Sequence, residues 1–159
     1  SGATTAVPTT ENGPRGLTNM YDTILFPTDG SEATIGAAEH AFSHAERYDA
    51  SIHVLSIVEV AGGLGTAGRE RAALDERRDE RASAAERIVS ETEPDGVETT
   101  IAVEFGSPAR VITEYVDRNA IDLVVMSTKG RSGAERIVFG SITDEVVRRA
   151  DAPVLAVRR

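Results

Sequence analysis

Cysteine is absent from this chain of 159 residues, and lysine occurs only once, at Lys129. Without cysteine, the protein has no disulfide framework, no thiolate metal site and no cysteine nucleophile. No apolar run approaches the roughly 20 residues needed to cross a membrane, and residues 1–19 lack the basic and apolar stretches of a signal peptide. We therefore expect a cytoplasmic protein that does not associate with membranes.

Positive charge is also scarce relative to negative charge. The chain has 26 acidic and 17 basic residues, which gives a formal net charge of -9. A negative surface repels nucleic acid and anionic membranes, so we expect neither as a partner. Many carboxylates with a single lysine also suit a protein from a high-salt cytoplasm, which predicts a halophilic source.

The length is typical of one α/β domain, and a hydrophobic fraction of 40% is enough to build its core. Residues 1–19 are rich in Thr, Gly and Pro and carry no apolar periodicity. We expect them to be an expression tag or a disordered leader. The domain itself is predicted to occupy residues 20–159.

Short apolar segments alternate with segments of helical periodicity along this domain. Strands are predicted at 21–27, 51–60, 97–105, 121–126 and 154–157, and helices at 32–48, 69–92, 108–119 and 142–149. Ser31 and Ser107 are the predicted N-caps of the first and third helices. This alternation predicts a parallel sheet with right-handed crossovers and helices on both faces. Ligands of such sheets bind beyond the carboxyl ends of the strands, where the strand order reverses.

Two of the three glycine patterns in the chain are poor candidates for a nucleotide site. Gly63 to Gly68 matches G-x-G-x-x-G, but the ribose-binding acid expected about 20 residues later falls near Glu86, within a predicted helix. We therefore expect this segment to be a mobile connector. A phosphate-binding loop of the G-x-x-x-x-G-K-[ST] type is excluded, because the only lysine, Lys129, follows Thr128.

The third pattern joins Gly130 to Gly140-Ser141-Ile142-Thr143 at the start of the last predicted helix. Glycines allow backbone amides to approach an anion, and a helix N-terminus favours phosphate. Taken alone, the pattern supports an anion site and an ordinary helix cap equally. Asp29, at the end of the first predicted strand, favours the site, because its carboxylate can accept from a ribose hydroxyl or help to hold a metal ion.

No catalytic constellation is evident in the sequence. No Ser-His-Asp arrangement or carboxylate pair is placed for acid–base chemistry, so we expect a protein that is not an enzyme, with slow ATP hydrolysis at most. His40 and His44 lie four residues apart on a predicted helix and could hold a metal ion. Because a third ligand is lacking, we interpret them as part of a solvated helix face.

Residues 20–159 resemble the universal stress protein family in its ATP-binding form. The motifs that carry the resemblance are Ile24-Leu25-Phe26-Pro27-Thr28-Asp29-Gly30-Ser31, Gly106-Ser107-Pro108, Val125 to Gly133, Gly140-Ser141-Ile142-Thr143 and Ala152 to Val157. The resemblance implies one doubly wound, five-stranded parallel α/β sheet of Rossmann-like, adenine nucleotide alpha hydrolase-like type. The implied strand order is 3-2-1-4-5.

The resemblance also implies a site for ATP, or for ADP or AMP, with Mg²⁺ or Mn²⁺ bound to the phosphates. The implied nucleotide-binding residues are Pro27, Thr28, Asp29, Ile57, Met126, Ser127, Gly130, Arg131, Gly140, Ser141, Ile142 and Thr143. Among them, Gly130 and the segment from Gly140 to Thr143 would hold phosphates and Asp29 would lie near the ribose. The backbone of Ile57 would hold the edge of the adenine.

Ser127 departs from the family motif, which has glycine at this position. A side chain there could obstruct the phosphates, or its hydroxyl could bind them. The alternative function is therefore a member of the family that binds no nucleotide and acts as a dimeric interaction module. A homodimer through Val154–Val157 is expected in either case, since this last strand would be an unpaired sheet edge and the family commonly pairs it.

Overall fold

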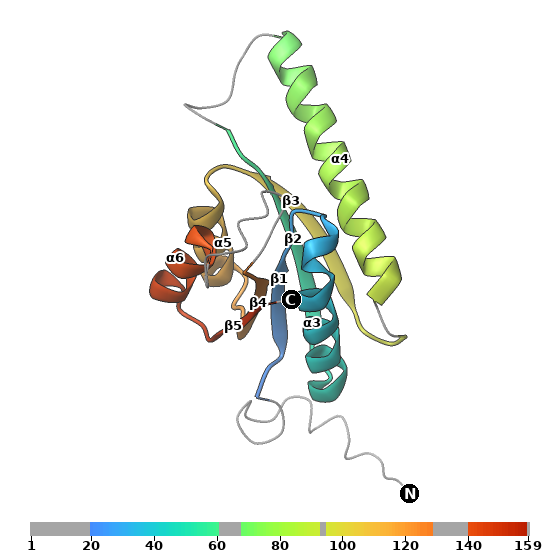
Figure 1. Ribbon diagram of the computed structural model, residues 1–159, viewed down its shortest axis with the longest axis vertical. Coiled ribbons are helices and arrows are strands. Elements are labelled where there is room, and N and C mark those ends of the chain that lie inside the picture. The colour runs from blue at the N-terminus through green and yellow to red at the C-terminus, as the bar shows by residue number, and fades with distance from the viewer. Residues whose placement is uncertain (1–19, 61–67, 93–94, 129–139, 159) are drawn as a thin grey trace, which may run out of the picture.

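The structure is a computed structural model that describes residues 20–60, 68–92, 95–128 and 140–158 (Figure 1). Its strands are β1 (Thr23–Pro27), β2 (Ser51–Val58), β3 (Thr99–Phe105), β4 (Leu123–Ser127) and β5 (Val154–Val157). Its helices are the 3-10 helix η2 (Glu32–Thr34) and the α-helices α3 (Ile35–Tyr48), α4 (Gly68–Thr92), α5 (Pro108–Arg118) and α6 (Ser141–Arg149). Each predicted strand and helix is therefore present, with boundaries that differ by a few residues.

The five strands form one parallel sheet in the order β3-β2-β1-β4-β5. This confirms the predicted α/β fold and its strand order. The chain builds outward from β1 through β2 to β3, and then returns to the other side of β1 to add β4 and β5. The reversal of strand order thus falls between β1 and β4, at the centre of the sheet.

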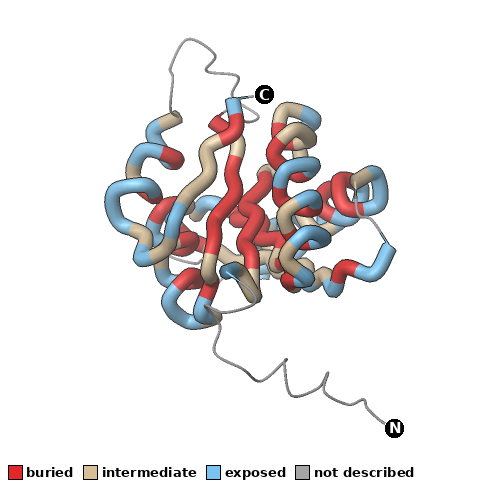
Figure 2. Tube along the Cα trace, turned by 90° about the horizontal axis from the view of Figure 1, so that it is seen from below, coloured by how far each residue is buried: buried red, intermediate tan, exposed pale blue. Residues whose placement is uncertain are grey.

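Helices cover both faces of the sheet, with α3 and α4 on one side and α5 and α6 on the other (Figure 1). Side chains of β1 alternate between the two layers, so that Ile24 and Phe26 pack towards α3 while Leu25 packs towards α5. Buried residues accordingly concentrate in the central strands (Figure 2). The near-continuous apolar sequence of these strands follows from burial on both faces.

Helix α4 is only partly covered by the rest of the domain. Ala85, Ile88 and Val89 are buried as predicted, whereas Leu74 is only half-buried. The first turns of α4 extend beyond the other helices (Figure 1) and consist mainly of charged, exposed residues. None of the helices in the described ranges is long and apolar enough to cross a bilayer.

The predicted serine caps are not formed as expected. The chain leaves β1 through the short helix η2 before α3 begins at Ile35, and the Ser31 side chain makes no capping hydrogen bond within the described part of the chain. The same is true of Ser107, although Pro108 occupies the first position of α5 as predicted. The single helix predicted from residue 32 is therefore divided at its start.

Candidate functional site

The site is defined by the separation of β1 from β4 at their carboxyl ends. In the described structure these strands pair only at Ile24 with Leu123 and at Leu25 with Val124. Pairing of β1 with β2 continues to Pro27, and pairing of β4 with β5 continues to Ser127. The two halves of the sheet thus part at the reversal of strand order, which is where ligands of doubly wound sheets bind.

The exit of β1 is organised by the buried hydroxyl of Thr28. Its Oγ1 lies 2.7 Å from Oγ1 of Thr34 and accepts a hydrogen bond from the Gly30 amide at 2.9 Å. The Ser31 amide donates to Oδ1 of Asp29 at 2.9 Å, which fixes the Asp29 carboxylate above the strand end. The Ser31 hydroxyl oxygen is buried without a hydrogen-bond partner among the described residues.

Gly30 presses the β1 exit directly against α4. Its φ is +81°, and a Cβ added to it would overlap the methyl group of Ala84. Only glycine combines this left-handed backbone with such close contact. Helix α4 is therefore held against the edge of the site, although its sequence contains none of the residues predicted to bind a ligand.

The exit of β4 is tied to both neighbouring segments by hydroxyl groups. Ser127 Oγ donates to the Ala33 carbonyl at 3.2 Å, and Thr143 Oγ1 donates to the Ser127 carbonyl at 3.1 Å. On the β2 side, Ser56 Oγ donates to the Thr28 carbonyl at 2.9 Å. We refer to these hydroxyl-bearing residues, Thr28, Thr34, Ser56, Ser127 and Thr143, as the hydroxyl network.

The N-terminus of α6 lies close to the β4 exit. Gly140 is its N-cap, and a Cβ there would lie 3.2 Å from the Thr128 carbonyl oxygen. The amides of the first turn point away from the helix without intrahelical acceptors, which makes this end suitable for an anion. The acidic residue of that turn, Asp144, is paired with Arg148 at 3.1 Å, which reduces its repulsion of a phosphate.

Sequence reasoning missed two arginines at the exit of β2. Arg81 Nη1 donates to the Ile57 carbonyl at 2.9 Å, and Arg77 Nη2 donates to the Glu59 carbonyl at 3.0 Å. Both belong to α4, where they lie four positions apart, so they extend from the same face of the helix. The only signal in the sequence was this spacing within a highly charged helix.

The structure brings most of the predicted site residues to one end of the sheet. Thr28, Asp29, Ser127 and Gly140 lie at the exits of β1 and β4 or at the start of α6. Two others face the core rather than solvent: Ile57 is 8% exposed and Met126 is 5% exposed, and both pack in the layer beneath α5.

The remaining predicted residues differ in exposure. Pro27 and Thr143 are buried, whereas Ser141 is exposed and Ile142 is 38% exposed. Gly130 and Arg131 lie outside the described residues, as do positions 63–67 of the first glycine pattern.

The described residues alone do not form a metal cage. Within the described ranges, no three His, Asp or Glu side chains gather closely enough to hold an ion. Asp29 is the one carboxylate at the β1 exit, and Mg²⁺ commonly binds through one or two carboxylates together with phosphates and water.

A second polar cluster lies away from this site, between β2 and α5. His53 Nδ1 is 2.7 Å from the Tyr115 hydroxyl, and the Arg118 guanidinium lies 5.4 Å from the centre of the Tyr115 ring. Burial lowers the pKa of His53 below its ordinary value of 6.5, against an opposing effect of Glu98. The lowered pKa favours the neutral imidazole, whose tautomer determines which of the two groups donates in this hydrogen bond.

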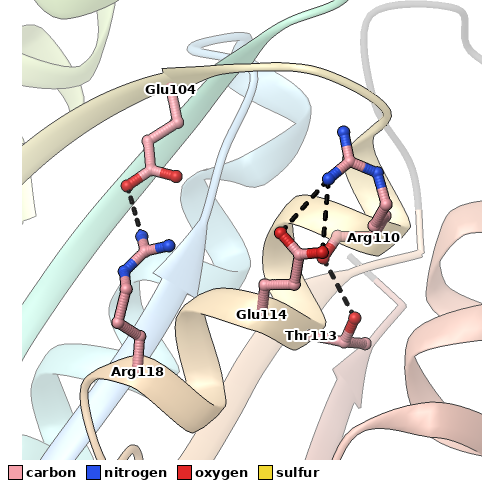
Figure 3. A network of polar contacts seen from close by, with 5 residues as sticks. All are labelled: Glu104, Arg110, Thr113, Glu114 and Arg118. Carbon is pink, nitrogen blue, oxygen red and sulfur yellow. Dashed lines mark hydrogen bonds and ion pairs between the residues drawn. The ribbon is translucent and has the colours of Figure 1, made fainter.

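The Tyr115 phenol is itself stabilised in its protonated form. Burial raises its pKa above the ordinary value of 10.0, the charge of Glu104 adds to this shift, and Arg118 opposes it. Near the surface of α5, Glu104 pairs with Arg118 at 2.6 Å and Arg110 pairs with Glu114 at 3.2 Å (Figure 3). These four residues, with Thr113, form the α5 charge network.

Comparisons with known proteins agree with this architecture. The model of the Universal stress protein family matches residues 20–158. Universal stress protein MJ0531 of Methanocaldococcus jannaschii is 34% identical over 143 residues, which cover 89% of this chain and 84% of that protein. The structure of universal stress protein UspA from Lactobacillus plantarum is 27% identical with a TM-score of 0.71, over 87% of this chain and 98% of that chain.

A universal stress protein solved in complex with cAMP has the same fold. It is 22% identical with a TM-score of 0.60, over 87% of this chain and 97% of that chain. This likeness concerns the arrangement of strands and helices.

Proposed function

Because this chain belongs to the universal stress protein family, we propose that it binds an adenine nucleotide, ATP or its di- or monophosphate, at the carboxyl ends of β1 and β4. The phosphates would lie at the N-terminus of α6, with the ribose beside Asp29. A divalent cation, Mg²⁺ or Mn²⁺, would be held mainly by the phosphates. In this role the protein acts as a regulatory nucleotide-binding protein of the stress response.

The observation that carries this proposal is that β1 and β4 stop pairing before their carboxyl ends. The Asp29 carboxylate, held by the Ser31 amide, lies on the β1 side of this separation, and the N-terminus of α6 lies on the β4 side. The buried Ser31 hydroxyl oxygen, which has no hydrogen-bond partner within the described part of the chain, adds a polar group with capacity for a ligand. A carboxylate accepts hydrogen bonds from the ribose hydroxyls, and the amides at a helix N-terminus donate to the phosphates, so the two groups complement the two polar parts of a nucleotide. An uncharged metabolite would use only one of these features.

Known structures of the same fold support adenine in particular. They include a universal stress protein in complex with cAMP, one from Archaeoglobus fulgidus in complex with dAMP, and a family protein from Arabidopsis thaliana with AMP bound. At 14 to 22% identity these likenesses extend to the fold and not to single residues. The proposal for this chain therefore depends on Asp29, the α6 terminus and the hydroxyl network.

Isothermal titration with ATP, ADP and AMP in the presence of Mg²⁺ tests the proposal. We expect saturable binding of at least one of them, and about tenfold weaker binding by Asp29→Asn, which loses a charged hydrogen-bond acceptor. Asp151→Asn, at an exposed turn before β5, is the matched control and should bind as the wild type does. Absence of heat at millimolar nucleotide would reject the proposal.

Ser127 does not need to disable this site. Its hydroxyl donates to the Ala33 carbonyl and so links β4 to η2, and a side chain engaged in this way leaves the phosphate side to backbone amides. We expect Ser127→Gly to weaken nucleotide binding by about threefold through loss of this link. A marked gain in affinity would instead mean that the side chain obstructs the phosphates.

We propose that the protein binds nucleotide with slow hydrolysis at most, because described polar side chains of the site are engaged in hydrogen bonds to the backbone. Thr143 and Ser127 hydroxyls donate to backbone carbonyls, and Asp29 accepts from the Ser31 amide. The rate of ATP hydrolysis can be measured as phosphate release over several hours. Turnover above about 1 s⁻¹, which is ordinary for an enzyme, would contradict it.

Self-association is a second proposed property, and it is the main alternative function if nucleotide does not bind. Strand β5 is the sheet edge, paired only with β4 among the described strands, and Val147 on the neighbouring helix α6 is 48% exposed. Unpaired edges beside apolar surface favour pairing with another chain. A homodimer through Val154–Val157 should give twice the monomer mass by light scattering, and a monomeric mass at micromolar concentration would contradict it.

A further inference from the structure

The position of the purine base in the proposed site follows from the order of the strands. The proposed phosphate position follows β4, and Asp29 follows β1. The next strand in the sheet is β2, at a spacing of about 4.8 Å. A nucleotide laid across these three strand ends has its phosphates, ribose and base in that order, so the base reaches the Ile57 end of β2.

The Ile57 carbonyl at this end already accepts a hydrogen bond from Arg81. Arg81 is held in place by the packing of α4. It lies three residues before Ala84, whose methyl group contacts Gly30, and four residues before the fully buried Ala85. Residues at these spacings share one helix face, so the Arg81 side chain extends over the exits of β1 and β2.

The hydrogen-bonding requirements of the two purine types differ at this position. Adenine carries an exocyclic amine that must donate, whereas guanine and hypoxanthine carry a 6-oxo oxygen that accepts. The amine needs a carbonyl acceptor, and at Ile57 it would compete with the guanidinium. A 6-oxo oxygen suits the guanidinium instead, because arginine commonly donates to this atom in nucleic-acid recognition.

Resting on the proposed function, we infer that Arg81 is a base-contacting residue that sets the purine selectivity of the site, lowering its preference for adenine and admitting 6-oxo purine nucleotides. Arg77 provides an internal contrast. It makes a similar bond one helical turn away, to the Glu59 carbonyl beyond the end of β2, and it is exposed. The Glu59 carbonyl that Arg77 contacts lies two residues beyond Ile57, so Arg77 should not affect binding of the base.

Titration of the full chain with AMP and with inosine monophosphate tests this inference. We expect the wild type to bind the two nucleotides within about fivefold of each other. Arg81→Met keeps the length of the apolar stem but removes the donors, and should shift the ratio of dissociation constants about fivefold in favour of AMP. Arg77→Met should leave the ratio unchanged, and Arg81→Lys, which retains a donor, should give an intermediate ratio.

The outcomes distinguish this inference from the proposed function. An unchanged AMP-to-inosine ratio in Arg81→Met, with both nucleotides still bound, would reject the role of Arg81 and leave the proposed function intact. Absence of binding of either nucleotide by the wild type would reject both. Thermal melting of each variant shows whether it is folded. If Arg81→Met is unfolded, Arg81→Lys decides: a shift of its ratio towards AMP supports the inference, and a wild-type ratio rejects it.

Discussion

The hydroxyl network at the exits of β1 and β4 differs in kind from the α5 charge network. The first consists of neutral side chains that are buried or half-buried and mostly bond to backbone carbonyls or amides. The second consists mainly of charged side chains on a helix surface, which bond to one another (Figure 3). Burial of a hydroxyl with its hydrogen bonds made costs little, whereas burial of a charge costs much more.

The comparison shows which polar groups determine the geometry of the site. A hydroxyl bonded to the backbone of another element fixes the distance between the two elements, as Ser127 does for β4 and η2. An exposed ion pair between mobile side chains imposes little restraint and is screened by salt. We therefore expect substitutions near the hydroxyl network to have large effects and those in the α5 charge network to have small ones.

The largest effect is expected for Gly30→Ala, beside the hydroxyl network. The new methyl group would overlap Ala84 and would also occupy a backbone with φ of +81°. Overpacking and left-handed strain together should lower the free energy of unfolding by about 3 kcal/mol. The measurement is urea-induced unfolding at constant m-value.

Gly96→Ala is the matched control for this substitution. Its φ is +92°, but apart from its chain neighbours no atom of the described residues lies within 4 Å of the added Cβ. It should cost only about 1 kcal/mol, from the backbone conformation. Equal losses in the two variants would contradict the close packing of Gly30 on α4.

Thr28→Val should have the next largest effect. Valine keeps the shape of threonine, but it removes the contact with the Thr34 hydroxyl and the acceptor for the Gly30 amide. An unsatisfied amide in this half-buried turn should lower the free energy of unfolding by about 2 kcal/mol. Nucleotide affinity should fall as well, because Thr28 directly precedes Asp29 and a disturbed turn would move the Asp29 carboxylate.

Thr113→Val provides the comparison within the α5 charge network. The Thr113 hydroxyl donates to the Arg110 carbonyl at 3.0 Å in an exposed position, where water can replace it. The expected change in unfolding free energy is below about 0.5 kcal/mol. Losses of similar size for Thr28→Val and Thr113→Val would remove the distinction between the two networks.

Most of the fold could be predicted from the sequence, because burial on both faces leaves a clear apolar pattern in parallel strands. The alternation of strands and helices was sufficient for the parallel sheet, and the motifs of the family resemblance supplied the strand order. Helix starts were less predictable. Ser31 has the residue type of an N-cap, but the hydroxyl of Thr34 and the tight turn at Gly30 determine the local backbone.

The site could be predicted only in part. Asp29 and Gly140 follow strands and could be found by that position. The engagement of Thr143 and Ser127 hydroxyls with carbonyls depends on the distance between segments 16 and 94 residues apart in the chain. Arg81 reaches Ile57 across 24 residues, so no local pattern reveals the contact.

The pH dependence of stability should show a smaller effect, which comes from the partly buried His53–Tyr115 pair. Because the pKa of His53 is lowered in the folded protein, the unfolded chain takes up a proton first as the pH falls below 6.5. The contribution of His53 to the free energy of unfolding should therefore be largest above pH 6.5. It should decline as the pH falls from 6.5 towards the lowered pKa of the folded protein. His53→Gln cannot take up the proton and should flatten this decline below pH 6.5.

Control variants test the assignment to His53. His40→Gln changes an exposed histidine of α3 and should keep the wild-type decline. Tyr115→Phe removes the hydroxyl that lies 2.7 Å from His53 Nδ1 and should cost about 1 kcal/mol near pH 7.5. An equal flattening by His53→Gln and His40→Gln would contradict the assignment.

The smallest effect is expected for the ion pair between Glu104 and Arg118. The two side chains are 31% and 54% exposed, so their 2.6 Å contact gains little in water. A double-mutant cycle with Glu104→Gln and Arg118→Gln should give a coupling energy of about 0.5 kcal/mol, and less in 1 M salt. The cycle is needed because Arg118 also lies over the Tyr115 ring, so its single substitution removes packing as well as charge. A coupling energy above about 2 kcal/mol would mean that this exposed network restrains α5 against β3 as firmly as the hydroxyl network restrains the site.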